Sequence, residues 1–427
     1  TRRTELGVAK IFPTGAFQID RGRLENFLLN DLCDVVQRGA KIAHVEEGEP
    51  HRVNYTIDGE KHVLSARWVI DATGRSRLMV RQKGLQKITD HPTHAVWFRI
   101  PKRIAIDQWG DDAWRERILD GERRWLSTNH LAGTGYWVWI IPLPDNLTSI
   151  GIVADARFHA LNQMDRPHKA MGWIEKHEPQ LFQAIAPTEF LDFKVLNHYA
   201  HHANQVFFPN RLAITGEAGL FLDPFYSPGS DFIALANEFI FDLIQQDLAG
   251  QSVPSRANIY NQLFISYYDQ TLPIYQNQYR LFGHSSLMSL KVIWDYALYW
   301  STFAFLFIQE RFTDLVFMGK IQKAFLEVGS CNQRVQHALN QWSLNPPAQA
   351  EGVFINKNSL PWLAKLNADL TLPLDFSQAQ QVFSHNLNQL QQLHDDIIAV
   401  SQGRPTSPLL EPVLPALFGH SLTLPTT

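Results

Sequence analysis

The hydrophobic pattern along the chain alternates between helical spacing and short strand-like runs. Residues 17–38 carry apolar side chains at helical spacing, and Asp20 is the expected N-cap. Short β-branched runs follow, with Asp58-Gly59 typical of a hairpin turn. The continuous apolar run at 68–70 ends in the turn 71–74, which predicts a buried parallel strand that leads into a tight loop.

The middle of the chain shows a second pattern. Strand-like segments alternate with segments of helical spacing, which predicts a mixed sheet with one face covered. The strand-like segments are 95–100, 136–143, 148–155 and 192–199, and the helical ones are 111–126 and 168–186. From about residue 253 onward the pattern is helical, and the proline-containing segment after Gly403 is expected to lie extended along the surface.

Composition and charge narrow the class of protein. The chain is 45% hydrophobic and 19% charged, which supports a large core, and its net charge of -4 argues against nucleic acid as a partner. The most apolar window, Tyr296–Ile308, is shorter than the roughly 20 residues of a membrane span. Two cysteines, Cys33 and Cys331, do not make a disulfide framework, and no secretory signal is visible, so the expected location is the cytoplasm.

Two separated motifs combine an apolar strand with a glycine turn. The first, at 69–81, brings the backbone N–H groups near Gly74 towards an anionic or polyhydroxyl ligand. The second, at 211–237, opens from a strand into Gly216-Glu217-Ala218-Gly219, continues through Asp223-Pro224 and starts a helix near Ser230. Small residues let the backbone approach a flat ligand, and the helix N-terminus favours negative charge. The sequence therefore predicts that both turns contact one cofactor.

The second motif resembles the FAD fingerprint of the flavin hydroxylase superfamily, and the first resembles its Asp-Gly motif. The segment 17–29 is similar to the helix whose arginine, here Arg21, approaches the cofactor. A third motif, Trp-x-Trp-x-Ile-Pro at 137–142, resembles the signature of flavin-dependent halogenases. An alternating strand with aromatic side chains on one face would also produce this pattern.

The resemblance implies an α/β fold with FAD as cofactor. We expect an FAD-binding Rossmann-like domain, incomplete at its N-terminus, with an inserted mixed-sheet substrate domain and a helical C-terminal region. The expected segments are 1–88 and 205–250 for the FAD-binding domain, 89–204 for the substrate domain and 251–427 for the helical region with its proline-rich tail. The glycine fingerprint for the ADP moiety, and the catalytic lysine that the family implies, are expected upstream of residue 1.

The resemblance and the turn chemistry together nominate site residues. The expected cofactor contacts are Arg21, Asp71, Gly74, Gly216, Glu217, Pro224, Gly229 and Ser230. The expected substrate pocket contains His130, Trp137, Trp139, Tyr226 and Ser227. No catalytic residue is nominated and no metal is expected, because His198, His201 and His202 fall in a strand-like stretch without a nearby carboxylate.

The chain also departs from the family pattern. Glu217 replaces the family's aspartate, which keeps the charge but changes its reach. Pro228 has no N–H, so one donor expected for halide is missing, which puts halogenation in doubt. Tyr226 replaces a catalytic glutamate of tryptophan-type halogenases, which argues against free tryptophan as substrate.

Several functions therefore stay open. The expected function is an FAD-dependent, halogenase-type oxidoreductase that uses reduced flavin and oxygen on an electron-rich aromatic or polyene substrate. The alternatives are a flavin monooxygenase (hydroxylase), a flavin-dependent double-bond reductase and a non-catalytic relic that acts as a binding protein. The implied partners are a small-molecule substrate, free or carried by a carrier protein, and a separate flavin reductase; a homo-oligomer is compatible with the sequence, and a membrane span is not expected.

Overall fold

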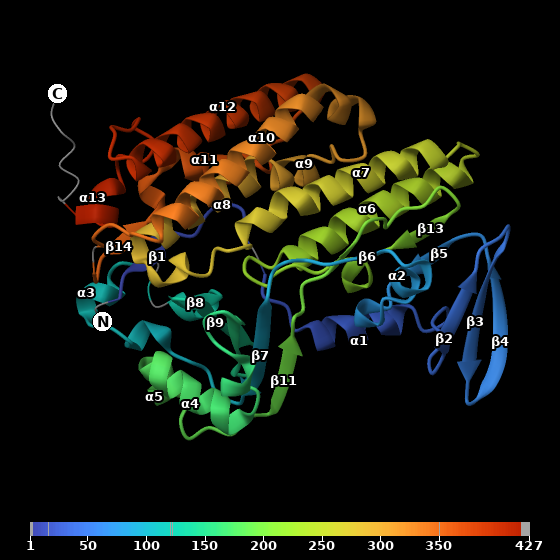
Figure 1. Ribbon diagram of the computed structural model, residues 1–427, viewed down its shortest axis with the longest axis horizontal. Coiled ribbons are helices and arrows are strands. Elements are labelled where there is room, and N and C mark those ends of the chain that lie inside the picture. Colours follow the sequence, from blue (N-terminus) through green and yellow to red (C-terminus); the bar gives the residue numbers. More distant parts are fainter. Residues whose placement is uncertain (1–2, 16, 120, 122, 350, 420–427) are drawn as a thin grey trace. The chain divides into compact units, whose positions relative to one another are not determined.

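The computed structural model describes residues 3–15, 17–119, 121, 123–349 and 351–419, which form two units of an α/β protein. The parallel-strand unit comprises Ile19–His91 and Tyr199–Leu272. The antiparallel-sheet unit comprises the described residues up to Gln18, together with Pro92–His198 and those from Pro273 onward. Figure 1 labels the helices and strands of both units.

The parallel-strand unit is built around one short pair of parallel strands, β5 (Val69–Asp71) and β13 (Leu212–Ile214). Before this pair come the helix α1 and an antiparallel meander of three strands, and the helix α2 follows β5. The bounds are α1 Arg21–Asp31, β2 Lys41–Glu46, β3 His51–Ile57, β4 Glu60–Ala66 and α2 Leu78–Lys83. The short strands β6 (Gln86–Lys87) and β12 (His202–Ala203) pair antiparallel.

Two long helices complete the parallel-strand unit. They are α6 (Pro228–Leu248) and α7 (Pro254–Thr271). Phe239 of α6 stacks on Tyr260 of α7 with ring centroids 4.1 Å apart, and Phe232 packs edge-on against Phe264. These ring contacts between α6 and α7 hold α7 in the unit that contains the second glycine turn.

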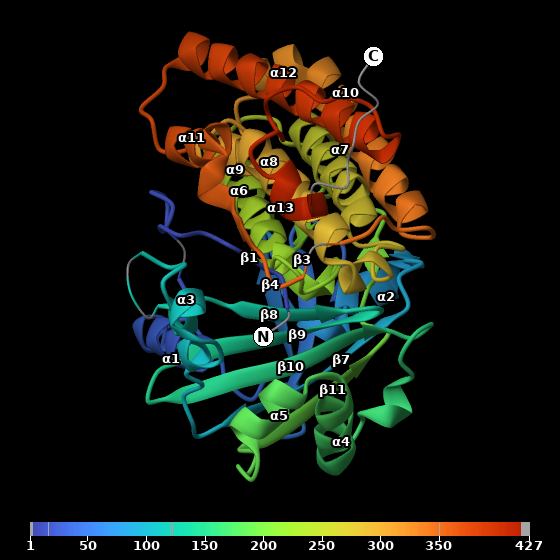
Figure 2. The same cartoon turned by 90° about the vertical axis from the view of Figure 1, so that its left-hand side faces the viewer.

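A five-stranded sheet organises the antiparallel-sheet unit, with strand order β11-β7-β10-β9-β8. The strands are β7 (Thr93–Ile100), β8 (Asn129–Gly133), β9 (Tyr136–Leu143), β10 (Leu147–Asp155) and β11 (Asp192–Asn197). The helices α4 (Pro167–His177) and α5 (Pro179–Ile185) pack on one face (Figure 2). The short helix α3 (Asp112–Arg115) precedes β8.

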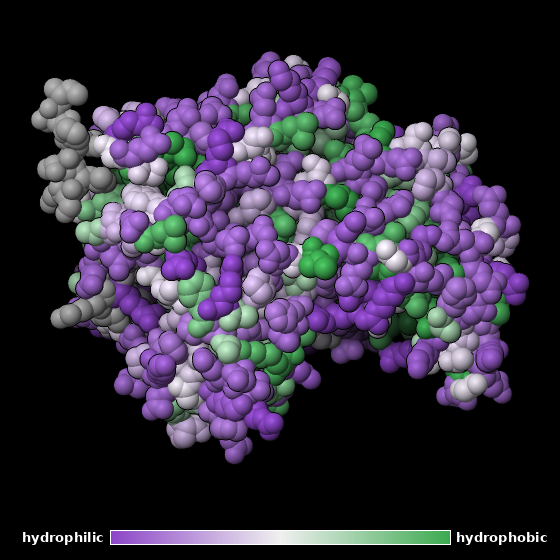
Figure 3. Space-filling view, in the orientation of Figure 1, coloured by the Kyte–Doolittle hydropathy of each residue, from purple (hydrophilic) through white to green (hydrophobic). Residues whose placement is uncertain are grey.

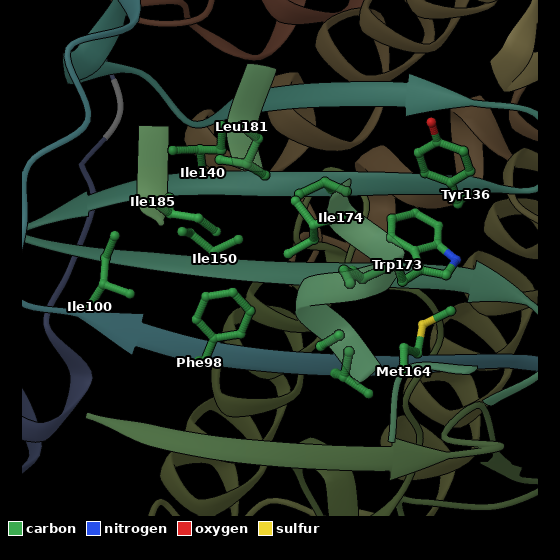
Figure 4. Packing of buried hydrophobic residues seen from close by; sticks show 14 of the residues in the cluster. Phe98, Ile100, Tyr136, Ile140, Ile150, Met164, Trp173, Ile174, Leu181 and Ile185 are labelled. Carbon is green, nitrogen blue, oxygen red and sulfur yellow. The ribbon is translucent and has the colours of Figure 1, made fainter. Parts of the chain in front are cut away.

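Alternate residues of the sheet strands build this core (Figure 4). Val138 and Ile140 of β9 point into it together with Ile150 and Ile152 of β10, while Phe98 of β7 stacks on Phe190 with centroids 3.8 Å apart. Burial of these side chains contributes roughly 25 cal/mol for each Å² of apolar surface. Because side chains alternate along a strand, Trp137 and Trp139 lie on the opposite face.

The C-terminal part of the same unit is helical. Figure 1 shows α8, α10 and α12 side by side. The elements are α8 Ser285–Ser301, α9 Phe303–Ile308, α10 Leu315–Trp342, α11 Pro361–Asp369, α12 Phe376–Ser401 and α13 Leu414–Phe418. Strand β1 (Glu5–Gly7) pairs parallel with β14 (Phe354–Asn356). None of the helices in the described ranges is long and apolar enough to cross a bilayer.

Many predicted elements are confirmed. The helix with Asp20 as N-cap is α1, where the Asp20 side chain accepts from the Arg23 N–H. Asp58-Gly59 closes the β3–β4 hairpin, with positive φ at both residues. The four expected strands of the middle region are β7, β9, β10 and β11.

Other predictions were wrong. Neighbouring strands of the five-stranded sheet are all antiparallel, so the sheet is not mixed; β8, β9 and β10 follow each other through short turns. Within the described part of the expected helix at 111–126, only α3 and a 3₁₀ turn at 124–126 are helical, because Arg124 bonds to Glu5 and Asp107 instead of continuing a helix.

The segment after Gly403 is not extended along the surface. It folds into turns and the helix α13, because Leu410, Val413 and Leu417 are buried. Residues 420–427 of the expected tail lie outside the described residues.

The expected segment boundaries also need correction. The described residues up to Gln18 belong with the antiparallel sheet, because β1 pairs with β14 and Thr14 hydrogen-bonds to Asn367. The helix α7 belongs with the parallel strands, because it packs on α6.

Helix α1 is more exposed than its apolar spacing predicts. None of its residues is buried, and Phe27 is 63% exposed. Ile70 of β5 is likewise 39% exposed, although the strand was expected to be fully buried. Figure 3 shows apolar side chains at several places on an otherwise largely polar face of the molecule.

Candidate functional site

The two glycine turns lie side by side. Strands β5 and β13 are parallel, and Ile214 pairs with Asp71. Both turns therefore begin at the same end of the strand pair. The Thr215 N–H donates to the Asp71 carbonyl at 3.0 Å. The two 3₁₀ turns that follow, Gly74–Ser76 and Gly216–Ala218, contact each other directly. The structure thus brings together two segments that are more than a hundred residues apart in sequence.

Asp71 fixes the first turn. One carboxylate oxygen accepts from the Thr73 N–H at 2.9 Å and from the Thr73 hydroxyl at 2.6 Å. The other accepts from the Met79 N–H at 2.7 Å, at the start of α2. Since the side chain is buried and already holds these three donors, its observed role is to shape the turn.

Backbone conformation favours glycine at both turns. Gly74 has a φ of 56° and Gly216 a φ of 60°, which lie in the left-handed region. Gly216 is partly exposed, as are Glu217 and Pro224. A Cβ at Gly216 would lie 3.5 Å from the nearest Ile233 atom, an ordinary contact, so the conformation sets the preference.

The Asp-Pro segment is anchored by a buried cluster. His91 Nε2 lies 2.6 Å from Asp223 Oδ2, and the Tyr199 hydroxyl donates to the same oxygen at 3.2 Å. Asp223 Oδ1 accepts from the Phe225 N–H at 2.9 Å. His91 and Tyr199 therefore hold the carboxylate that folds the turn before α6. Sequence analysis missed both residues, because they precede Asp223 by 132 and 24 positions and lie outside the motif.

The two residues that precede α6 have unusual backbone conformations. Tyr226 and Ser227 are both left-handed, with φ of 67° and 57°. Such conformations cost non-glycine residues about 1–3 kcal/mol each and cluster at functional sites. The Ser227 side chain makes no capping bond, and Pro228 is the first helical residue. Gly229 and Ser230 follow in the first turn of α6, and the helix lies beside the Gly216–Ala218 turn, where Ile233 is the nearest side chain to Gly216.

Arg21 is on the surface of the same unit. Its side chain is 81% exposed, and the guanidinium pairs with Glu25 one helical turn away, at 2.7 Å. The structure thus gives Arg21 a surface ion pair on α1, and its contact with a cofactor stays a prediction.

The halogenase-like motif forms an aromatic face on the antiparallel sheet. Trp137 and Trp139 are 5.7 Å apart between ring centroids, and His130 of β8 lies edge-on to Trp137 at 5.1 Å. Trp97 of β7 extends the face at 6.4 Å from Trp139. The Trp137 indole donates to the Tyr279 hydroxyl at 3.1 Å. His130, Trp137 and Trp139 are therefore neighbours on one face of the sheet, and their role in a substrate pocket stays a prediction.

A glycine makes room for this face. Gly151 of β10 pairs opposite Trp139, and a Cβ there would lie 2.1 Å from the Trp139 ring. The indole therefore lies across the neighbouring strand, where its N–H donates to Ser149 Oγ at 3.1 Å. Only glycine at 151 is compatible with this placement.

Two of the three histidines near residue 200 have contacts within the protein. No cluster of three or more His, Cys, Asp or Glu that could hold a metal occurs among the described residues. His202 instead bonds to Thr89 Oγ1 and stacks on Tyr268. Burial, followed by the charges of Lys87 and His201, lowers the pKa of His202. His201 contacts the second glycine turn, which the sequence did not indicate.

Comparison with known proteins identifies the family. The tryptophan halogenase family matches residues 13–281, more than half of the chain. Flavin-dependent halogenase chlA of Dictyostelium discoideum is 25% identical over 294 residues, which are 66% of this chain and 47% of that protein. The 1H-pyrrole-2-carbonyl-(peptidyl-carrier protein) chlorinase of Pseudomonas fluorescens is 27% identical over 236 residues, 53% of this chain and 49% of that protein. The chain thus spans about half the length of these curated relatives.

Solved structures share the fold. Halogenase PltM in complex with phloroglucinol and FAD aligns with a TM-score of 0.61 and 15% identity, covering 88% of this chain and 81% of that one. CmlS, a flavin-dependent halogenase, aligns with a TM-score of 0.51 and 18% identity, covering 63% of this chain and 47% of that one. With the sequence match, the chain belongs to the tryptophan halogenase family of FAD-dependent enzymes.

Proposed function

We propose that this chain is the flavin-contacting and substrate-contacting part of a halogenase-type oxidoreductase that modifies an electron-rich aromatic or polyene substrate. The observation that carries the proposal is the direct contact between the turns Gly74–Ser76 and Gly216–Ala218. A bound reduced flavin supplies electrons to oxygen, and the protein supplies binding, orientation and electrostatics.

The described residues fit the ribityl and isoalloxazine parts of a flavin. Gly74 and Gly216 both have positive φ and are partly exposed. They lie where the paired strands β5 and β13 end. The N-terminus of α6, uncapped by the Ser227 side chain, offers the positive end of a 21-residue helix. The cofactor contacts that we propose are Arg21, Asp71, Gly74, Gly216, Glu217, Pro224, Gly229 and Ser230.

The aromatic face supplies the proposed wall for the substrate. Trp137 and Trp139 are held by hydrogen bonds through their indole N–H groups, so their rings have fixed orientations. Flat, rigid aromatic surfaces bind an aromatic ring at low entropic cost. Together with His130, Tyr226 and Ser227, they make up the proposed substrate residues. The Pseudomonas relative is named for a carrier-bound pyrrole, and a substrate carried in this way is compatible with our proposal.

A monooxygenase is the second candidate. Pro228 is the first residue of α6 and has no N–H to offer to a halide at that position. Direct oxygen transfer needs no halide site. In both cases we propose that a separate flavin reductase supplies the reduced flavin and that the enzyme works in the cytoplasm.

The proposal is tested by comparing Gly216→Ala with the matched control Gly59→Ala. Both glycines have positive φ, of 60° and 87°, and neither substitution introduces a steric clash. Each variant should therefore lose about 1 kcal/mol in the free energy of unfolding. Only Gly216→Ala should weaken FAD binding, by about tenfold or more, in a titration followed by the flavin absorbance at about 450 nm.

The outcomes separate the candidate functions. Equal FAD affinities of the two variants would contradict the proposed cofactor site, and a full-length protein that never takes up FAD would favour a non-catalytic binding protein. With bound flavin, a product that contains bromine only when bromide is present identifies a halogenase. A hydroxylated product formed without halide identifies a monooxygenase, and a saturated double bond identifies a reductase.

A further inference from the structure

The two tryptophans of the Trp-x-Trp-x-Ile-Pro motif differ in exposure. Trp137 is buried, with 1% of its surface exposed, whereas Trp139 is partly exposed. Their ring centroids are 5.7 Å apart and the rings are tilted by 47°, so the buried ring packs against the exposed one. A ring with almost no exposed surface does not itself meet a ligand. Trp137 therefore acts on a ligand through Trp139.

A tyrosine from the C-terminal part of the same unit fixes the buried tryptophan. The Trp137 indole N–H donates to the Tyr279 hydroxyl at 3.1 Å. The Tyr279 carbonyl accepts from the Gly135 N–H at 2.9 Å, just before strand β9 begins. Tyr279 is itself 1% exposed and stacks on Phe282 with ring centroids 4.9 Å apart. Two hydrogen bonds and a packed ring thus define where the indole lies.

The two residues before Tyr279 are bonded to helix α10. The Gln278 side-chain amide donates to the backbone carbonyl of Gln336 at 3.2 Å, inside the protein. The Asn277 carbonyl accepts from the side chain of Asn340, one helical turn further along α10. These two residues and Tyr279, which we call the clamp, therefore connect α10 to strand β9.

A buried polar network supports α10 where the clamp begins. The Gln336 side chain donates to Asp295 at 2.8 Å and accepts from Lys291 Nζ at 2.8 Å, and both partners are on α8. Lys291 and Asp295 also form a buried ion pair at 2.9 Å. Because removal of one partner from a buried ion pair is costly, the network favours one register of α8 against α10. The clamp is therefore anchored on a fixed pair of helices.

We propose that Tyr279 and Trp137 are positioning residues through which the C-terminal helices orient Trp139, the motif tryptophan that contacts the substrate. The role of Trp139 rests on the proposed function, whereas the clamp rests on the contacts above. The Trp139 ring lies over Gly151, and its N–H donates to Ser149. The ring thus contacts the sheet and Trp137 at once, so a displaced Trp137 changes how it lies.

The clamp is tested by NMR of the full chain with ¹⁵N-labelled tryptophan, and no cofactor is needed. Tyr279→Phe removes the acceptor of the Trp137 indole N–H, so the proton signal of this N–H should move upfield. Tyr136→Phe is the matched control, because it removes a buried hydroxyl that bonds to Glu178 on the opposite face of the same strand. Trp137→Phe identifies the signal. Equal movement in the two tyrosine variants, or none, would overturn the proposal.

A second pair of variants tests whether α10 acts through the clamp. Asn340→Ala removes the bond to Asn277, whereas Gln341→Ala changes the next residue of the helix, which is exposed. Only Asn340→Ala should move the indole signals of Trp137 and Trp139. Signals that stay in place in Asn340→Ala would overturn the role of the helices.

The positioning role is tested by titrating the labelled chain with resorcinol, a small electron-rich aromatic probe. The Trp139 indole signal should move in a saturable way. Tyr279→Phe should weaken the affinity about threefold, and Tyr136→Phe should leave it unchanged. A response at Trp139 that is the same in both variants would overturn the inference alone. No saturable response at Trp139 in the unsubstituted chain would contradict the aromatic face as a substrate site, and the positioning role with it.

Discussion

At the scale of single residues, buried carboxylates shape the parallel-strand unit. Asp71 holds the turn after β5, Asp223 holds the turn before α6, and Asp247 near the end of α6 collects three donors. Buried charges are tolerated where hydrogen bonds satisfy them. Each of these residues therefore fixes a loop or a helix end.

Asp247 makes a testable contribution to stability. Burial alone would raise its pKa, but hydrogen bonds from Arg67, Trp68 and Arg211 outweigh burial and hold the pKa at about 2. The carboxylate is only 4% exposed, yet Arg67, which covers it, is 55% exposed, so water screens the interaction. We expect Asp247→Asn to lower the free energy of unfolding by about 1–3 kcal/mol at neutral pH.

The sign of the pH dependence follows from the lowered pKa. Because the folded value lies below that of the unfolded chain, the stabilisation is present above about pH 4 and is lost as the pH falls through about 2. Urea unfolding across this range should show the stability difference between Asp247→Asn and the unsubstituted protein shrinking with acid. The exposed Glu60→Gln serves as the control; a difference that stays constant at every pH would refute the assignment.

At the scale of elements, the antiparallel sheet carries two faces with different tasks. One face packs against α4 and α5, and the other carries Trp97, Trp137 and Trp139, of which Trp137 is buried. The sequence predicted which residues share a face, because successive side chains along a strand point to opposite faces. It did not predict that neighbouring strands are antiparallel, since strand direction depends on which strands pair.

The aromatic face depends on one glycine. Gly151→Ala places a Cβ where the Trp139 ring lies, so the indole must move. Overpacking of this kind costs about 1–3 kcal/mol. Gly172→Ala in α4 is the matched control, because a Cβ there meets no atom within 4 Å and alanine favours a helix by up to about 1 kcal/mol. Near-UV circular dichroism should change for Gly151→Ala only; unchanged Trp signals would contradict the described packing.

Predictions from sequence succeeded where local chemistry decides the structure. The Asp20 cap, the Asp58-Gly59 hairpin and the two glycine turns each follow from backbone preferences of the residues present. The predicted helix at 111–126 was wrong, because Arg124 bonds to Glu5, which is distant in sequence. Likewise, His201 gave no local sign of its contact with the second glycine turn, since its partner Glu217 lies 16 residues away.

At the scale of the whole molecule, the chain is divided between two units that each collect distant segments. Val69–Asp71 pairs with Leu212–Ile214, and Glu5–Gly7 pairs with Phe354–Asn356. For the first pair, the sequence predicted two similar strand-and-glycine-turn motifs that contact one cofactor, but not the pairing of the strands themselves. The second was not, because three-residue strands carry too little pattern.

The central claim is that the turns Gly74–Ser76 and Gly216–Ala218 together contact one flavin. Hydrogen exchange of the backbone amides, measured by mass spectrometry with and without FAD, tests this claim most directly. The account predicts slower exchange in both turns on addition of FAD, with no change in the β3–β4 hairpin around Asp58-Gly59. Protection of only one turn, or of neither, would contradict it.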